Sequence, residues 1–179
     1  GQPVMCVQGL TREPAFRNIS FEVRAGEVLG FFGLVGAGRS EIMRAIFGVD
    51  KATAGTVTLN GQAVHIHSPK DAVANGLALV PEDRKHDGLA LRLSVMENMT
   101  LVKLPDISPA GFIDQAKRRQ LSDTYVSDIR GKTPSIRQLA GNLSGGNQQK
   151  VLLAKWMMRD PEVLILDEPT RGIDVGAKF

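Results

Sequence analysis

Residues 33–40, Gly33-Leu34-Val35-Gly36-Ala37-Gly38-Arg39-Ser40, decide the fold of this 179-residue chain. They lie between an apolar run, residues 27–32, and a helical pattern, residues 41–47, so we expect a strand, a glycine-rich turn and a helix in succession. Glycines let successive backbone N–H groups point at one anion, and the start of the following helix adds positive partial charge there. This order predicts a phosphate-binding loop. Its candidate contact residues are Gly33, Gly36, Ala37, Gly38, Arg39, Ser40 and Glu41.

Arg39 is the one departure of this loop from the pattern G-x-x-x-x-G-K-[ST], which has a lysine at that position. Lysine presents a compact ammonium on a thin stem, whereas arginine presents a wide planar fork. Because catalysis of phosphoryl transfer depends mostly on positioning and charge stabilisation, we expect slow or absent turnover at this loop. Nucleotide binding is expected to persist, since the backbone amides and Ser40 remain.

The composition predicts an ordinary globular domain with its own core. Apolar residues make up 42% of the chain and charged residues 23%. No apolar run approaches the roughly 20 residues that span a bilayer. The single cysteine, Cys6, excludes an internal disulfide. The net charge of +3 comes from scattered lysines and arginines, which favours a solvated surface and predicts no nucleic-acid partner.

Hydrophobic periodicity predicts the remaining elements. Strands are expected over residues 4–7, 19–23, 77–80 and 163–166, with a hairpin over residues 55–66 that turns at Asn60-Gly61. Helices are expected over residues 69–75, 114–130 and 148–159, and from the capping box at Ser94 and Glu97. We therefore expect one α/β domain. Its core and β subdomain would occupy residues 1–88 and 158–179, with a helical subdomain inserted over residues 89–157.

Two further groups of residues carry chemistry. The apolar strand over residues 163–166 ends at Asp167 and Glu168, and ligands bind beyond the carboxyl ends of parallel strands. Asp167 and the Ser40 hydroxyl are candidate Mg²⁺ ligands, and Glu168 is a candidate base for the water that attacks a γ-phosphate. The alternative is a capped strand with solvated acids. Ser144-Gly145-Gly146, ahead of a helix, predicts a second anion site.

Taken together, these motifs resemble the nucleotide-binding domain of ATP-binding-cassette (ABC) transporters. Leu143–Gly146 is similar to the family's signature motif, Asp167–Thr170 to its second acidic motif, and Arg171–Asp174 lies where its D-loop follows. A denser similarity covers residues 33–41, 80–85, 142–150 and 168–178. It is to the second cassette of the fused two-cassette ATPases of bacterial monosaccharide importers, the ribose, galactose, arabinose and xylose type.

The resemblance implies a P-loop fold and a head-to-tail pair of cassettes. Each ATP, with Mg²⁺, would lie between the phosphate loop of one cassette and the signature of the other, here Ser144, Gly145, Gly146 and Gln148. The second cassette would belong to the same native polypeptide. ATP binding and hydrolysis would drive a membrane permease that is fed by a periplasmic sugar-binding protein, with the cassettes peripheral on the cytoplasmic side of the inner membrane.

Glu82 departs from the family pattern, which usually has a glutamine there, near Mg²⁺ and the permease contact. A carboxylate also ligates Mg²⁺, so Glu82 is a candidate metal residue. The family pattern continues after Phe179 with a helix, a strand and a switch position that is usually histidine. We therefore expect the given sequence to be truncated before the switch strand, and to hydrolyse ATP weakly or not at all when isolated.

Two other functions remain open. A catalytically inactive nucleotide-binding cassette with a regulatory or structural role is favoured locally by Arg39 and Glu82. A chromosome-maintenance or repair ATPase would share the signature motif. The short insertion between Glu82 and Leu143 and the absence of coiled-coil heptads argue against that second possibility.

Overall fold

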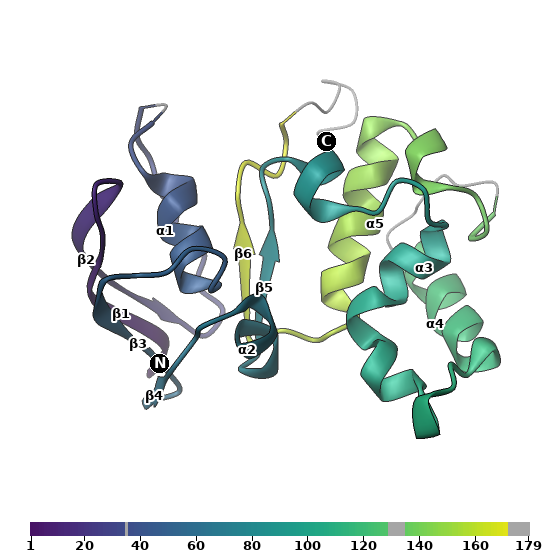
Figure 1. Ribbon diagram of the computed structural model, residues 1–179, viewed down its shortest axis with the longest axis horizontal. Coiled ribbons are helices and arrows are strands. Elements are labelled where there is room, and N and C mark those ends of the chain that lie inside the picture. The colour runs from purple at the N-terminus through teal and green to yellow at the C-terminus, as the bar shows by residue number, and fades with distance from the viewer. Residues whose placement is uncertain (35, 129–134, 172–179) are drawn as a thin grey trace. The chain divides into compact units, whose positions relative to one another are not determined.

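A computed structural model describes residues 1–34, 36–128 and 135–171 (Figure 1). Its internal contacts divide the chain into two compact units. The first unit comprises residues 1–79 and 161–165, and the second comprises residues 80–160 together with the chain from Leu166 onward. In the described residues, no helix is both long enough and apolar enough to cross a bilayer.

An antiparallel sheet of four strands forms much of the first unit, in the order β2-β1-β3-β4. The strands are β1 (Pro3–Arg12), β2 (Phe16–Arg24), β3 (Ala54–Leu59) and β4 (Gln62–Val64). Met5 and Val7 of β1 pair with Leu59 and Val57 of β3, and all four side chains are buried. The predicted hairpin is confirmed, since Asn60 and Gly61 both have positive φ, as a two-residue turn between twisted strands requires.

Outside the four-stranded sheet lie two helices, α1 and α2, and a pair of strands, β5 and β6. Helix α1 (Arg39–Ile46) buries Ile42 and Ala45, and α2 (Pro69–Ala74) begins at Ser68, whose hydroxyl accepts from the Asp71 N–H. β5 (Leu77–Val80) pairs with β6 (Val163–Leu166), as Figure 1 shows. The N–H of Glu162 donates to Gly76, and the N–H of Asp167 donates to Val80. These two strands therefore run in the same direction, and both predicted strands are confirmed.

The apolar run over residues 27–32 does not form the predicted strand. A strand needs a hydrogen-bonded neighbour, and in the described part of the chain the sheets include no partner for this segment. Val28 and Phe32 are each 96% exposed, so the apolar character of the run is not used for burial here. The Phe31 ring does contact Phe21 of β2 edge to face, with centroids 5.0 Å apart.

Helices make up the second unit. Its elements are η1 (Arg84–Gly88), α3 (Val95–Thr100), η2 (Leu101–Ile107), η3 (Pro109–Gly111), α4 (Gln115–Asp128), η4 (Ala140–Asn142) and α5 (Gly145–Met157). The capping box is confirmed, since the Ser94 hydroxyl accepts from the Glu97 N–H and the Glu97 carboxylate accepts from the Ser94 N–H. Helix α5 begins three residues before the predicted start at Gln148, so Gly145 and Gly146 form part of its first turn.

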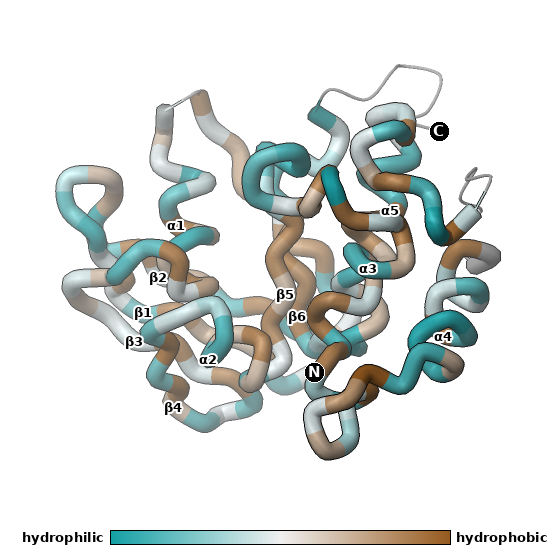
Figure 2. Tube along the Cα trace, turned by 45° about the vertical axis from the view of Figure 1, so that its right-hand side comes forward, coloured by the Kyte–Doolittle hydropathy of each residue, from teal (hydrophilic) through white to brown (hydrophobic). Residues whose placement is uncertain are grey.

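Helix α4 is strongly hydrophilic, whereas β5 and β6 are brown along their length in Figure 2. The residues that α4 buries are polar: Arg118 donates through Nε to the Thr100 hydroxyl at 2.9 Å, and Ser122 is fully buried. The predicted apolar positions Leu121 and Tyr125 are only half-buried, and the third, residue 129, lies outside the described residues. The buried positions of α4 are thus the polar residues Arg118 and Ser122, and not the predicted apolar ones.

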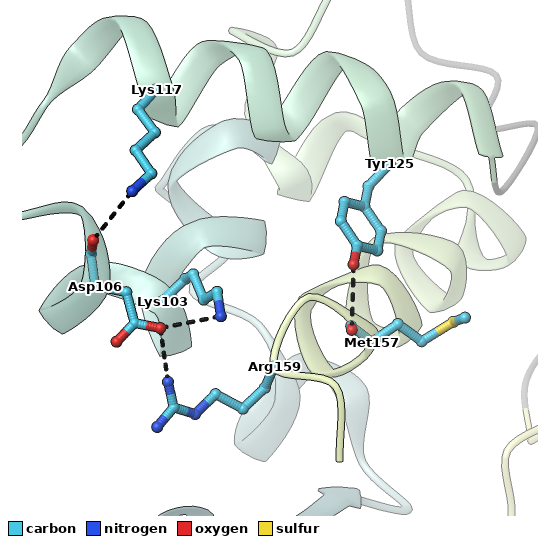
Figure 3. Close-up of polar contacts among 6 residues, drawn as sticks. All are labelled: Lys103, Asp106, Lys117, Tyr125, Met157 and Arg159. Carbon is cyan, nitrogen blue, oxygen red and sulfur yellow. Dashed lines mark hydrogen bonds and ion pairs between the residues drawn. The ribbon is translucent and has the colours of Figure 1, made fainter.

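Polar contacts also join the helices of this unit, as Figure 3 shows. The Asp106 carboxylate in η2 pairs with Lys103 at 3.0 Å and with Arg159, after α5, at 2.9 Å. The Tyr125 hydroxyl of α4 donates to the Met157 carbonyl at the end of α5, at 3.3 Å. The Asp106–Arg159 pair joins η2 to the chain after α5, and the Tyr125–Met157 hydrogen bond joins α4 to the end of α5.

Candidate nucleotide-binding site

The predicted phosphate loop has the backbone that an anion site needs. Gly36 and Gly38 both have φ of +83°, in the left-handed region that favours glycine. Helix α1 begins directly after Gly38, and a glycine has no side chain with which to cap the first turn. Gly38 thus supplies no side-chain cap to the first turn of α1, and the N-terminus of a helix is a ready site for phosphate.

Gly38 also allows a close approach of two chain segments. A Cβ at this position would lie 2.9 Å from the Ala15 carbonyl oxygen, a separation that real side chains do not adopt. A Cβ on Gly36 would meet nothing within 4 Å. The two glycines thus share one backbone conformation but differ in packing, since only Gly38 is buried.

Arg39 folds back across the loop. Its Cδ would lie 3.8 Å from a Cβ built on Gly33, so the stem of the side chain passes over the first glycine of the motif. The side chain is half-buried. The stem of the side chain that replaces the lysine of the pattern therefore lies beside Gly33.

The second unit contains the acidic strand end. The Asp167 N–H donates to the Val80 carbonyl at 2.9 Å, and Asp167 is half-buried, whereas Glu168 is exposed. Glu168 has φ of +43°, which is strained for a residue other than glycine. The Arg171 N–H donates to the Glu168 carbonyl at 3.0 Å and closes a tight turn. The residue predicted to be the catalytic base thus occupies a strained turn at the end of β6.

Glu82 has a partner that the sequence did not indicate: its carboxylate forms an ion pair with the Arg171 guanidinium. The next residue, Asp83, accepts from the N–H groups of His86 and Lys85, and these hydrogen bonds lower the pKa of the Asp83 carboxyl. Asp83 therefore caps η1. The ion pair with Arg171 occupies the Glu82 carboxylate that was predicted to be a metal ligand.

The signature residues lie at the start of α5. Ser144 is the exposed N-cap, and its hydroxyl accepts from the Asn147 amide at 3.1 Å. Gly145 and Gly146 follow in the first turn and are half-buried. Ser144 is therefore accessible at the surface of the unit, as a site for another molecule requires.

Gln148 is buried in the second unit, and its predicted contact to nucleotide stays a prediction. It is 3% exposed, and its side chain donates to the Ala140 carbonyl at 3.2 Å and accepts from Arg84 Nε at 3.4 Å. Both ends of the amide are thus engaged inside the second unit. Gln148 lies four residues after Ser144, so both residues are on the same side of α5. The Gln148 side chain nevertheless turns toward η4, where its amide donates to the Ala140 carbonyl.

Sequence reasoning did not assign roles to Arg84 or Arg171. Arg84 lies in residues 80–85 and Arg171 in residues 168–178, two of the segments that carry the family resemblance. That resemblance was the one indication that these residues matter. Ser40 belongs to the first unit, whereas Asp167 and Glu82 belong to the second. A magnesium site shared by these residues therefore stays a prediction.

The fold and the glycine-rich loop define the class of the molecule, an α/β nucleotide-binding domain of the P-loop type. The sequence profile described as ABC transporter matches residues 16–171, and the chain therefore belongs to the ABC transporter family. The predicted family and its fold are confirmed.

Curated relatives resemble almost the whole chain. It is 51% identical over 178 residues to a putative ribose/galactose/methyl galactoside import ATP-binding protein 1 of Rhizobium etli, covering 99% of the chain and 34% of the relative. It is 50% identical over 180 residues to the ribose import ATP-binding protein RbsA of Geobacillus kaustophilus, covering 99% of the chain and 36% of the relative. The chain thus spans about a third of the length of these relatives.

Solved structures show the same fold. A dimeric ATP-binding cassette in a post-hydrolysis state, bound to ADP and Pi, matches with a TM-score of 0.79 and 20% identity, covering 97% of this chain and 77% of that one. The protein cbiO1 from Clostridium perfringens, part of an ABC transporter complex, matches with a TM-score of 0.76 and 21% identity, covering 99% of this chain and 70% of that one. At these identities the likeness concerns the fold alone.

Proposed function

We propose that this chain is the ATP-binding and ATP-hydrolysing cassette of a monosaccharide importer. The observation that carries the proposal is the identity of about half of its residues with import ATP-binding proteins for ribose and galactose, over 99% of the chain. Two structural features support it: an uncapped helix start after Gly38 and an exposed Ser144 at the start of α5. A membrane permease and a second, head-to-tail cassette are the partners of this function.

In this function the first turn of α1 binds the phosphates of ATP through its N–H groups. Ser40 and Asp167 supply hard oxygen ligands that fit Mg²⁺, which when bound neutralises charge on the β- and γ-phosphates. Glu168 accepts the proton of the attacking water. Glu82 fits the metal less well, because Arg171 already neutralises its carboxylate.

Arg39 reduces turnover at the cassette's own phosphate loop, while the signature residues complete the site of the partner cassette. Arg39→Lys in the complete native protein is therefore expected to raise ATP turnover, because the compact ammonium of lysine reaches between β- and γ-phosphates. Ser144→Arg, which places a bulky cation at the exposed N-cap, is expected to abolish turnover at the partner's site. Thr124→Arg on the exposed surface of α4 is the matched control. Unchanged turnover in Ser144→Arg would contradict the proposal.

A second candidate is a regulatory or structural cassette that binds nucleotide without hydrolysing it. Arg39 in the loop and the Glu82–Arg171 ion pair favour this candidate for the local site. Glu168→Gln separates the two. Turnover of the complete protein falls in this variant if the cassette hydrolyses ATP itself, and stays unchanged if the cassette binds nucleotide without hydrolysing it.

The location follows from the same proposal. A cassette that drives a permease lies on the cytoplasmic side of the bacterial inner membrane and is fed indirectly by a periplasmic sugar-binding protein. Co-purification of the complete protein with membranes that contain the permease, and its loss when the permease is absent, tests this part of the proposal.

A further inference from the structure

Arg84 joins three segments that are far apart in the sequence. It is half-buried at the start of η1, and its Nη1–H donates to the Arg171 carbonyl at 2.7 Å. Its Nε–H is directed at Oε1 of Gln148 in α5, 3.4 Å away. All three residues belong to the second unit. One planar guanidinium thus links the start of η1, the turn over residues 168–171 after β6, and helix α5, which begins with the signature residues.

The ion pair between Glu82 and Arg171 is a second link between the same turns. Arg171 closes the turn that begins at Glu168, whose backbone is strained at φ +43°. Such strain persists only where the surroundings hold it. Glu82 holds this turn through the Arg171 side chain, and Arg84 holds it through the Arg171 carbonyl.

The link continues into the signature loop through Gln148. Its amide donates to the Ala140 carbonyl at 3.2 Å, and that carbonyl also accepts from the Leu143 N–H at 3.2 Å. Leu143 directly precedes Ser144, whose carbonyl accepts from the Gln148 N–H at 2.9 Å. Hydrogen bonds therefore run without a break from the Glu168 turn to the signature loop.

We propose that Arg84 is a positioning residue that fixes the Glu168 turn relative to the signature loop, with the Glu82–Arg171 ion pair as its second tether. We call these three residues and Gln148 the Arg84 clasp. Through it, the predicted base of this cassette and the surface offered to the partner cassette keep one relative position. The consequence for turnover rests on the proposed function, whereas the clasp itself is a property of the fold.

Arg84→Lys is the variant that tests the clasp in the complete native protein. Lysine keeps the positive charge but has neither the Nε–H nor the Nη–H that arginine presents in one plane, so it reproduces neither the bond to Gln148 nor the bond to Arg171. Amide hydrogen exchange is then measured in two segments, residues 166–171 and residues 143–150. We expect about tenfold faster exchange in both segments, because a hydrogen bond from a charged group is lost at each. Arg119→Lys, at an exposed position of α4, is the matched control. Faster exchange in one segment only, in neither, or equally in the control overturns the proposal.

Charge exchange tests the second tether. Glu82→Arg and Arg171→Glu each place like charges together, and each is expected to speed exchange in residues 166–171 by about fivefold. The double variant restores an ion pair of reversed polarity, and exchange is expected to return to within about twofold of the wild-type rate. If exchange in the double variant stays as fast as in the single variants, the ion pair does not tether residues 166–171.

Steady-state ATP hydrolysis separates this inference from the proposed function. We expect Arg84→Lys to lower kcat with little change in KM for ATP, because the clasp does not include the phosphate loop. Faster exchange with unchanged kcat overturns the role of Arg84 in turnover. A wild-type protein that hydrolyses no ATP refutes the proposed function, while the exchange measurements still decide whether the clasp exists.

Discussion

Gly38→Ala and Gly36→Ala are a matched pair that tests the shape of the phosphate loop. Both glycines have φ of +83°, so both variants force alanine into the left-handed region. They differ in space: the new Cβ meets the Ala15 carbonyl oxygen at 2.9 Å in one case and nothing within 4 Å in the other. The difference between the two variants therefore isolates the close contact from the backbone strain.

The two costs have separate magnitudes. Left-handed backbone costs alanine about 1–2 kcal/mol, and the less flexible unfolded chain returns about 0.4–1 kcal/mol. Gly36→Ala is thus expected to lower the free energy of unfolding by about 1 kcal/mol. Gly38→Ala adds overpacking against backbone that cannot swing away, which costs about 1–3 kcal/mol more.

The loop can also relieve the contact by moving, and nucleotide binding reports that movement. A shift of the Gly38 backbone displaces the first turn of α1, to which the proposed function assigns phosphate binding. We expect the affinity for a fluorescent ATP analogue to fall at least tenfold in Gly38→Ala, about 1.4 kcal/mol, and at most a few-fold in Gly36→Ala. Urea unfolding followed by circular dichroism measures the stability difference. Equal losses in the two variants, in both stability and affinity, would refute the close contact at Gly38.

Three further predictions concern the second unit. Asn98→Leu is expected to lower the free energy of unfolding by about 3 kcal/mol, because the buried Asn98 amide accepts from the Ala90 N–H and donates to the Ala90 carbonyl; a loss below about 1 kcal/mol in urea unfolding would contradict this. The pKa of Glu97 is lowered by the hydrogen bonds from the Ser94 hydroxyl and N–H. Wild-type stability is therefore lost as the pH falls through that lowered pKa, and Glu97→Gln should lose less between about pH 5 and about pH 3; parallel losses in the two proteins would be evidence against the capping carboxylate. Burial lowers the pKa of Lys155, so the unfolded chain binds more protons and stability should rise as the pH approaches 10.5 from below; the same rise in Lys155→Met would exclude Lys155 as its source.

Local rules were sufficient for the parts of the fold that short segments determine. The Asn60-Gly61 turn, the capping box at Ser94 and the glycine-rich loop before α1 each depend on neighbours within a few residues. Their side chains and φ requirements are written in the sequence itself. The exposed position of Ser144 at a helix start follows from the same kind of rule.

Several features that the sequence did not predict depend on partners outside the local segment. An apolar run such as residues 27–32 satisfies the pattern of a buried strand, but a strand exists only where a neighbour accepts its hydrogen bonds, and pattern says nothing of that neighbour. Gln148 is a polar residue near a helix start, which is typical of a ligand contact. The sequence does not indicate that Ala140 and Arg84 bind the two ends of its amide.

The same reasoning applies to Glu82. The family resemblance marks Glu82 as a candidate metal ligand, but it does not indicate the ion pair that its carboxylate forms with Arg171. Glu82 and Gln148 both belong to the Arg84 clasp, so a single variant at Arg84 tests the contacts of both. If the clasp exists, Glu82 and Gln148 act on turnover through the position of Glu168 and Ser144 rather than by touching nucleotide or metal. Their substitution would then change kcat and leave the affinity for nucleotide nearly unchanged, whereas residues of the phosphate loop would change the affinity directly.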